Sequence, residues 1–389
     1  MVNICNSIDC TGCAACESSC ASHAITMEYS EEGFLYPHID AAKCVDCGFC
    51  KKVCPNNHMA EVHQPEAYLA WIKDSDIRFE SSSGGVFSAV AMEVIRRGGI
   101  VCGAAFDEDM IVRHVTIDNI EGLARLRGSK YTQSVIGDIY AQIRLALIAE
   151  RWVYFVGTPC QVAGLRNFLL KDYEKLITSD VICHGVPSGL LLKEQISAFE
   201  LRFSSKIEGF NFRAKLRMGQ TPDVAITMHK RSGTPDASTK YMNFETLPYC
   251  YGFRRNTIIR ESCYCCLYAK VQRLGDITLG DFWNVKTWFP DVKRSPGCSL
   301  ILVSTDKGRE MLQDISNQIV LRKTTIEAAI SKQAQLKVPL KRPVERDQYR
   351  SYKEFDQYCQ TFLKPPFKYR FKKHLVNFAK IVTLFKYRY

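Results

Sequence analysis

Two cysteine-rich stretches near the start of the chain determine how its first 55 residues fold. The first reads CTGCAACESSC over residues 10–20, and the second reads CVDCGFCKKVCP over residues 44–55. Both have the spacing C-x2-C-x2-C-x3-C, and a proline follows the second one. Between them, residues 24–27 and 34–39 are apolar enough to form short strands around a polar turn at 30–33. The repeat therefore predicts a small α+β module built around its cysteines.

This spacing is typical of modules that bind two 4Fe–4S clusters. In paired-cluster ferredoxins, three cysteines of one motif and the last cysteine of the other hold each cluster. We therefore expect one ligand set of Cys10, Cys13, Cys16 and Cys54, and another of Cys20, Cys44, Cys47 and Cys50. Zinc knuckles are the alternative, because C-x2-C pairs also bind zinc. Four cysteines in this spacing, present twice, favour iron–sulfur clusters. Ala21 stands where a proline often follows the first motif, which removes no ligand.

The composition agrees with metal binding in a reducing compartment. The 389 residues include 18 cysteines, yet the first ten residues do not resemble a signal peptide. No apolar run is long enough for a membrane-spanning helix, so we expect a cytoplasmic protein.

The net charge of +11 is concentrated at the end of the chain. Residues 364–389 contain eight Lys or Arg and no acidic residue, so the rest is close to neutral and no nucleic-acid partner is expected. Apolar residues recur at helical spacing from Phe371 to Phe385. This pattern predicts peripheral contact with an anionic membrane. Packing on the protein itself or on a partner subunit is the alternative.

From residue 67 onward, expected strands and helices alternate, which predicts an α/β domain. We expect four segments: the cluster module at 1–56, a linker at 57–66, the α/β domain at 67–340 and a basic tail at 341–389. Residues 205–260 are more β-rich, and their strand order cannot be predicted.

A third group of cysteines lies within the α/β domain. Cys160 and Cys183 follow two expected buried strands, where α/β sheets place their ligands, and Cys263 and Cys266 form a C-x2-C pair. The spacing alone leaves a third cluster and a zinc pair with ordinary buried thiols equally open, and Cys265 could replace Cys266. No role is assigned to the remaining cysteines, which are Cys5, Cys102, Cys250, Cys265, Cys298 and Cys359.

Several blocks of sequence, in order, carry a resemblance to a known family. The chain resembles the beta subunit of coenzyme F-420-reducing hydrogenase and its dehydrogenase relatives, placed behind a two-cluster ferredoxin. The matching blocks, which together with the module cover residues 1 to about 305, are SSSGGVFSA, LRGSKYTQS, FVGTPCQVAGL, DVICHGVPS, FNFRAK, RESCYCC and GDITLGDFWN.

The resemblance implies a non-Rossmann α/β domain that binds FAD and a third 4Fe–4S cluster, held by Cys160, Cys183, Cys263 and Cys266. It implies an oxidoreductase that passes electrons from ferredoxin, or a similar one-electron donor, through its clusters and FAD to an organic substrate. Some relatives are associated with surface-polysaccharide biosynthesis. The alternatives are an oxidoreductase of the deazaflavin coenzyme F-420 itself and a non-catalytic electron-relay subunit.

Candidate flavin-binding residues lie in three of these blocks. Ser83, Gly84 and Gly85 precede an expected helix, where backbone N–H groups suit a pyrophosphate, although a simple helix cap is the alternative. The other candidates are Arg127, Gly128, Ser129, Lys130 and Tyr131, together with Thr158 and Gln161.

Two residues are weak catalytic candidates. Lys130 could stabilise an anionic flavin ring, and a solvated basic loop is the alternative. His184 follows an expected cluster ligand and could move protons near neutral pH, and a structural histidine is the alternative.

Overall fold

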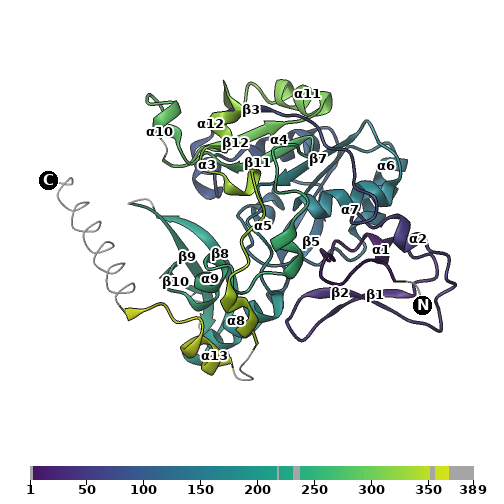
Figure 1. Ribbon diagram of the computed structural model, residues 1–389. Coiled ribbons are helices and arrows are strands. Elements are labelled where there is room, and N and C mark those ends of the chain that lie inside the picture. The colour runs from purple at the N-terminus through teal and green to yellow at the C-terminus, as the bar shows by residue number, and fades with distance from the viewer. Residues whose placement is uncertain (1–2, 217–218, 231–236, 294, 351–354, 368–389) are drawn as a thin grey trace.

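The first module lies at one end of the molecule in the computed structural model, which describes residues 3–216, 219–230, 237–293, 295–350 and 355–367 (Figure 1). Strands β1 (Ile25–Tyr29) and β2 (Leu35–Ile39) form an antiparallel hairpin, as the sequence predicts. Helices α1 (Ala15–Ser18) and α2 (Phe49–Lys52) each lie within one cysteine motif. Ala14 and Gly48, at equivalent motif positions, both have left-handed backbone, with φ of 64° and 71°. The repeat in the sequence is therefore a repeat in the backbone.

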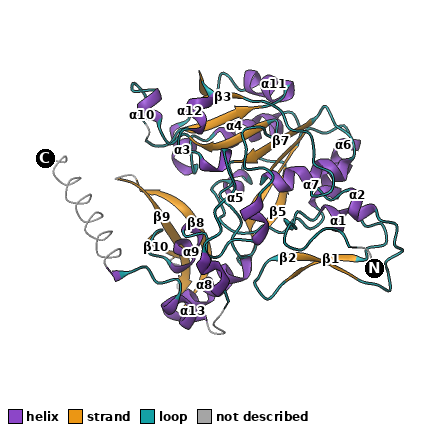
Figure 2. Cartoon of the chain, viewed as in Figure 1, coloured by secondary structure: helices purple, strands orange, loops and turns teal. Residues whose placement is uncertain are grey.

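An eight-stranded sheet forms the centre of the larger domain, as Figure 2 shows. Its order is β13-β3-β12-β11-β7-β6-β4-β5. Strands β4, β6, β7 and β11 are parallel, and the pairs toward both edges are antiparallel. The strands are β3 (Glu66–Ile72), β4 (Ile100–Phe106), β5 (Val112–Ile117), β6 (Val153–Gly157), β7 (Leu176–Val181), β11 (Ile277–Asp281), β12 (Ser299–Val303) and β13 (Ile319–Thr324).

Helices cover both faces of this sheet, because its parallel strands are apolar on both sides. Helices α4 (Val86–Arg96) and α11 (Asp306–Asp314) pack in one apolar cluster with Tyr154 of β6. Helices α6 (Ile139–Ile148) and α7 (Pro159–Leu169) pack on the other side with Phe155. The α/β architecture expected for this part of the chain is confirmed.

A second, three-stranded antiparallel sheet accounts for the β-rich region whose order the sequence left open. Its order is β10-β9-β8, formed by β8 (Ser205–Leu216), β9 (Gly219–Lys230) and β10 (Ala237–Asn243). Helices α8 (Gly189–Phe203), α9 (Pro248–Arg254) and α13 (Phe355–Thr361) lie around it (Figure 1). The remaining short helices are α3 (Ser75–Glu80), α5 (Leu123–Leu126), α10 (Val285–Trp288), α12 (Ile326–Ile330), and the 3-10 turns η1 (Glu261–Cys265), η2 (Ala334–Leu336) and η3 (Val344–Gln348).

One expected helix is shorter than the sequence suggests. Apolar residues at helical spacing predict a helix over residues 134–150, but α6 spans Ile139–Ile148. The reason is that Val135 is held by β5, since the Val135 N–H donates to Val112 O and its carbonyl accepts from the His114 N–H. This pairing leaves the Ser134 side chain facing the interior.

The segment from residue 341 begins as part of the folded body rather than as a tail. Arg346 is buried and pairs with Glu32 of the first module at 2.7 Å, and Tyr358 of α13 is also buried. Part of the expected linker at 57–66 is also bonded to the larger domain, because His63 and Arg273 exchange two backbone hydrogen bonds.

The expected amphipathic helix at 371–385 lies outside the described residues. No helix within the described residues is long and apolar enough to span a membrane.

Candidate functional site

The first cysteine set converges inside the first module. Four thiols from its two motifs, those of Cys10, Cys13, Cys16 and Cys54, line one small cavity. Cys5, to which the sequence assigned no role, lines it too and lies next to Cys10 and Cys54. Burial raises the pKa of the Cys13 thiol to about 12. The four thiols that the spacing assigns to one cluster thus line a single cavity, and their role as its ligands stays a prediction.

The second set, Cys20, Cys44, Cys47 and Cys50, lies at the surface. Cys47 is exposed and the other three are partly buried. Burial opposes ionisation of Cys20, but hydrogen bonds from Ser22 and the Ala24 N–H outweigh it and lower its pKa. Burial, with the nearby thiols of Cys47 and Cys20, raises the pKa of Cys50.

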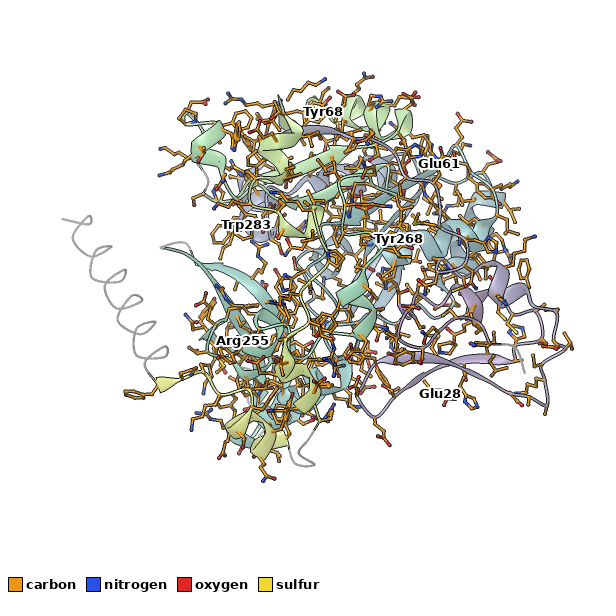
Figure 3. All side chains as sticks on the ribbon, in the orientation of Figure 1. Glu28, Glu61, Tyr68, Arg255, Tyr268 and Trp283 are labelled. Carbon is orange, nitrogen blue, oxygen red and sulfur yellow. The ribbon has the colours of Figure 1, made fainter. Side chains whose placement is uncertain are left out.

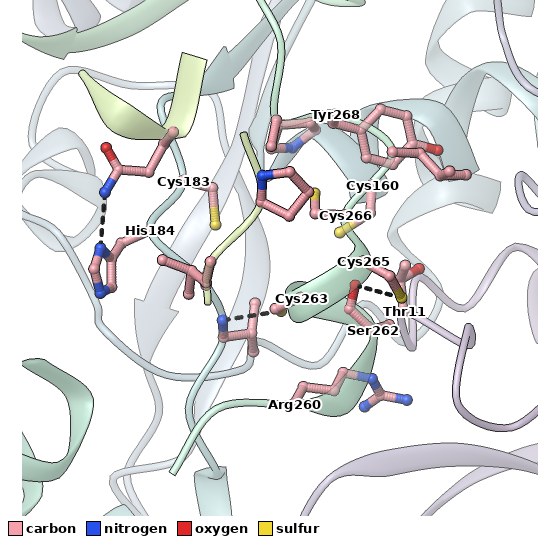
Figure 4. A pocket seen from close by; sticks show the side chains of 18 of the residues that line it. Thr11, Cys160, Cys183, His184, Arg260, Ser262, Cys263, Cys265, Cys266 and Tyr268 are labelled. Atoms are coloured by element: carbon pink, nitrogen blue, oxygen red, sulfur yellow. Dashed lines mark hydrogen bonds between the residues drawn. The ribbon is translucent and has the colours of Figure 1, made fainter. Parts of the chain in front are cut away.

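The third set is assembled at the carboxyl edge of the parallel strands. Strands β6 and β7 are neighbours, so Cys160 in the first turn of α7 and Cys183 just after β7 reach the same place. Cys263 lies in the η1 turn, and Cys266 directly follows that turn. All four line one cavity of about 330 Å³, shown in Figure 4.

Cys265 lines the same cavity as Cys266, and the two thiols differ in their surroundings. Burial is the main cause that raises the pKa of the Cys263 thiol to about 12, and the charges of Cys160 and Cys266 raise this pKa further. Cys265 is exposed, and its Sγ lies 3.8 Å from Asp9 Oδ1 and 3.6 Å from Ser262 O.

Three buried polar groups beside the third set fit a bound cluster. Arg260 Nη2, Ser262 Oγ and Tyr268 Oη have no hydrogen-bond partner within the described part of the chain, and all three residues line the cavity. Tyr268 lies near the middle of the molecule, as Figure 3 shows. Buried donors without partners are costly, and the sulfur atoms of a cluster would accept from them.

The thiols are spread more widely than a single ion requires. Among the described residues, no group of three His, Cys, Asp or Glu side chains converges on one metal-ion position. A zinc ion would hold its thiolates about 2.3 Å from a single point. A four-iron cube has its ligands on separate corners, so it does not require the thiols to converge on one point.

The two main flavin candidates meet each other in space. The Ser129 N–H donates to Ser82 Oγ at 2.8 Å, which joins the 127–131 turn to the 81–85 loop. Arg127 forms an ion pair with Glu80, and its Nε has no partner among the described residues.

The glycine at residue 84 is required by the fold itself. Its N–H donates to Ser299 Oγ at 2.9 Å, and an added Cβ would lie 2.5 Å from Ala70 O. Gly85 precedes α4 with φ of +86°. A substitution at residue 84 would therefore disturb strands β3 and β12 whether or not a phosphate binds nearby.

Cationic side chains gather beside Ser83. Lys215 Nζ donates to Ser83 O at 3.1 Å and to Arg78 O at 2.9 Å, and Arg213 pairs with Asp281 at 2.6 Å. Burial and the charge of Arg213 lower the pKa of Lys215 to about 8. Arg78, Arg213 and Lys215 thus lie close together, with Asp281 paired to Arg213. This excess of positive charge suits an anionic ligand, and sequence reasoning had not selected any of the three cations.

Lys130 is committed to the interior of its own turn. Its Nζ donates to the carbonyls of Arg125, Leu126 and Arg127 at 2.8–3.0 Å. Burial lowers its pKa to about 7. These bonds give Lys130 a structural role at the end of α5, and its catalytic role stays a prediction.

Thr158 and Gln161 form the cap of α7 and extend to Cys160. Thr158 Oγ1 lies 3.0 Å from Cys160 Sγ, and Gln161 Oε1 accepts from the Thr158 N–H. Gln161 Nε2 donates to Ser134 Oγ, which lies 3.0 Å from Nδ1 of the buried His114. Sequence reasoning missed His114 and Ser134, because neither follows a recognisable spacing.

His184 lines the third cavity with both ring nitrogens occupied. Nε2 is 2.8 Å from Asn256 Oδ1, and Gln335 Nε2 is 2.9 Å from Nδ1. Because the amide oxygen accepts and the amide nitrogen donates, this pattern suits a neutral ring protonated at Nε2. Burial also lowers the pKa of His184. The structure therefore supports the structural alternative for this residue.

Family models match three consecutive parts of the chain. Residues 9–58 match the 4Fe-4S dicluster domain. Residues 67–139 and 150–329 match the N-terminal and C-terminal models of the coenzyme F420 hydrogenase/dehydrogenase beta subunit. The chain belongs to this family. It is thus an iron–sulfur member of an oxidoreductase family with a role in electron transfer.

Two known proteins give the scale of the similarity within the F420 hydrogenase/dehydrogenase beta family. The coenzyme F420-dependent sulfite reductase of Methanocaldococcus jannaschii is 25% identical over 344 residues, which is 87% of this chain and 50% of that protein. The chain therefore spans about half the length of this relative. A chain of the F420-reducing [NiFe] hydrogenase complex from Methanosarcina barkeri matches 77% of this chain and 91% of its own, with 17% identity and a TM-score of 0.43.

Proposed function

We propose that the protein is an FAD- and 4Fe–4S-dependent oxidoreductase with three clusters, two in the first module and one at the carboxyl edge of the parallel strands. The observation that carries this proposal is the convergence of Cys160, Cys183, Cys263 and Cys266, from three separate segments, on one cavity. Clusters supply one-electron transfer, and a flavin supplies the exchange between single electrons and hydride.

The three cysteine sets form a row through the protein. Cys47 of the second set is at the surface. The charge of Cys50, in the same set, contributes to raising the pKa of the buried Cys16 thiol of the first set. Cys13 of the first set lies against α7, since a Cβ at Gly164 would be 3.1 Å from Cys13 Sγ. The charge of Cys160, in the third set, contributes to raising the pKa of the Cys13 thiol. This order supports entry of single electrons at the exposed set, from ferredoxin or a similar donor.

We place the FAD where the 81–85 loop meets the 127–131 turn. The supporting observations are the Ser82–Ser129 contact and the cations Arg78, Arg213 and Lys215, which suit a diphosphate. The organic substrate stays unassigned, and a link to surface polysaccharides stays a prediction from the resemblance. The name of the M. jannaschii relative favours one alternative, direct reaction with coenzyme F420.

Cofactor analysis of anaerobically purified protein tests this proposal. We expect about twelve irons, as much acid-labile sulfide, and one FAD per chain. About eight irons would contradict the third cluster, and zinc without sulfide would contradict all three. A protein that binds no flavin after reconstitution would be an electron relay.

The electron donor is tested by stopped-flow reduction of the bound flavin. Reduced ferredoxin should reduce it quickly in wild type and slowly in Cys47→Ser, which lacks a ligand of the exposed set. A Cys359→Ser variant, changed outside the cysteine sets, is the control. NADH should react poorly, because no G-x-G-x-x-G motif follows a strand. Reduced coenzyme F420 that reacts equally fast with both variants would favour the deazaflavin alternative.

A further inference from the structure

Arg260 lies between the first and third cysteine sets. It immediately precedes η1, and its side chain is fully buried. Its Nε donates to the carbonyl of Cys10 at 2.7 Å, and the same side chain lines the cavity of the third set (Figure 4). One guanidinium group therefore borders two cysteine sets that belong to different domains.

The positive charge of Arg260 has no carboxylate partner among the described residues. Its side chain also contacts Gln133 Oε1, 3.5 Å from Nη1, and the rings of Tyr36 and Phe34, whose centroids are 4.0 Å and 5.8 Å from the guanidinium carbon. Its Nη2 has no hydrogen-bond partner among the described residues. The two other deeply buried arginines differ, because Arg273 pairs with Asp180 and Arg346 pairs with Glu32.

A buried cation without a counter-charge is unfavourable unless negative charge is supplied nearby. Four thiolates around a cluster supply such charge, and reduction by one electron adds a further negative charge. Net charge and hydrogen bonds to sulfur are the protein's main means of setting a cluster's reduction potential. A cation between the first and third sets therefore stabilises the reduced form of a cluster at either set.

We propose that Arg260 sets the reduction potentials of the first and third clusters together, by holding one uncompensated positive charge between them. This inference depends on the proposed third cluster. Its role is electrostatic positioning, since the side chain exchanges neither atoms nor electrons with either site. The charge of Arg260 acts on thiols of the first and third sets, so we expect a cluster at the second set to keep its potential.

The test is a redox titration followed by electron paramagnetic resonance, on full-length protein with its clusters. Arg260→Gln removes the charge and keeps an amide donor. We expect full iron content and lower potentials for the two clusters beside residue 260, with the cluster of Cys20, Cys44, Cys47 and Cys50 unchanged. Arg260→Lys should restore much of the loss. Arg255→Gln, which removes one positive charge from an exposed pair with Glu345, should leave all potentials in place.

A second variant keeps the inference testable if Arg260→Gln loses iron. Gln133→Glu places a carboxylate within reach of the guanidinium and preserves the oxygen that accepts from the Leu35 N–H at 3.0 Å. It should lower the same two potentials while Arg260 remains in place.

Unchanged potentials in either iron-replete variant would overturn the proposal, and so would equal shifts in all three clusters. About eight irons in the wild type would instead refute the third cluster. The proposed effect of Arg260 on two clusters would then fail as well, and iron analysis alone would show this.

Discussion

The two cysteine sets of the first module are drawn from motifs of the same spacing but have different surroundings. Cys13, Cys16 and Cys54 are buried, whereas Cys47 of the second motif is exposed. The backbone does not cause this difference, because Ala14 and Gly48 adopt the same left-handed turn. It arises because α7 and Arg260 of the larger domain pack against the first set. The motif thus determines which thiols converge, and the second domain determines which of them meet solvent.

The largest effect is expected from removing a cysteine of the third set, which lies against the first set. Cys160→Ala should lose about four of about twelve irons, because a cube needs four ligands. The two clusters of the first module should remain, since their ligands all lie before residue 55. Iron analysis and resonance spectra check this, with Cys265→Ala as a matched control that keeps all iron. Loss of iron from the covered set as well would show that the two sets are not separable.

The next effect concerns the ion pair that fastens the first module. Arg346→Gln leaves Glu32 without its partner and removes a bond to Ile259 O, so the free energy of unfolding should fall by about 2–3 kcal/mol. A chelator should then remove iron faster from the first set than from the exposed one. Arg255→Gln breaks an exposed pair with Glu345 and should cost less than about 1 kcal/mol. If the two variants lost the same free energy of unfolding, the cover of the first set would not depend on the pair between Glu32 and Arg346.

Acid should destabilise the larger domain through His114. Burial lowers the pKa of His114 to about 4, from an ordinary value of about 6.5. Between these values the unfolded chain binds the proton that the folded chain excludes, so stability is lost as the pH falls. The loss between pH 7 and pH 5 should be about 2 kcal/mol.

Denaturant unfolding at the two pH values, compared with His114→Gln, isolates this contribution, because acid lability of the clusters is common to both proteins. A pH dependence that is the same in both would show that another group is responsible.

The smallest effect is expected at the hydroxyl beside the third set. Thr158→Val removes the contact with Cys160 Sγ and part of the α7 cap, so it should lower the potential of the third cluster and cost about 1 kcal/mol of stability. Thr158→Ser retains the hydroxyl and should behave as wild type. A Val variant with an unchanged potential would assign Thr158 to helix capping alone.

Local spacing predicted much of this protein, because some features depend only on neighbouring residues. The turns that gather the first two sets, the strands β4, β6 and β7, and the places of Cys160 and Cys183 all follow from short sequence patterns. Other features depend on contacts between distant residues. The order of β8–β10, the late start of α6 at Ile139 and the burial of Arg346 could not be predicted, since each is decided by a partner elsewhere in the chain.

The candidate site divides in the same way. The eight thiols of the first module could be predicted from their fixed intervals, whereas the third set was expected only from strand ends and the family resemblance. The groups around them could not, since an arginine at residue 260 or a histidine at residue 114 gains its meaning only from what the fold places beside it. The glycine at residue 84 shows the reverse case, where a motif suggestive of phosphate binding is also explained by close strand packing.

The ion pair between Glu32 and Arg346 joins residues 314 positions apart, and this has a consequence for synthesis. The first module leaves the ribosome long before the residues that cover it. At about 5–20 residues per second, that interval is roughly 15–60 s. During this time its thiols meet the cell's oxidants without their cover. Cells that make this protein in air would therefore gain most from delivering iron and sulfide to the nascent chain.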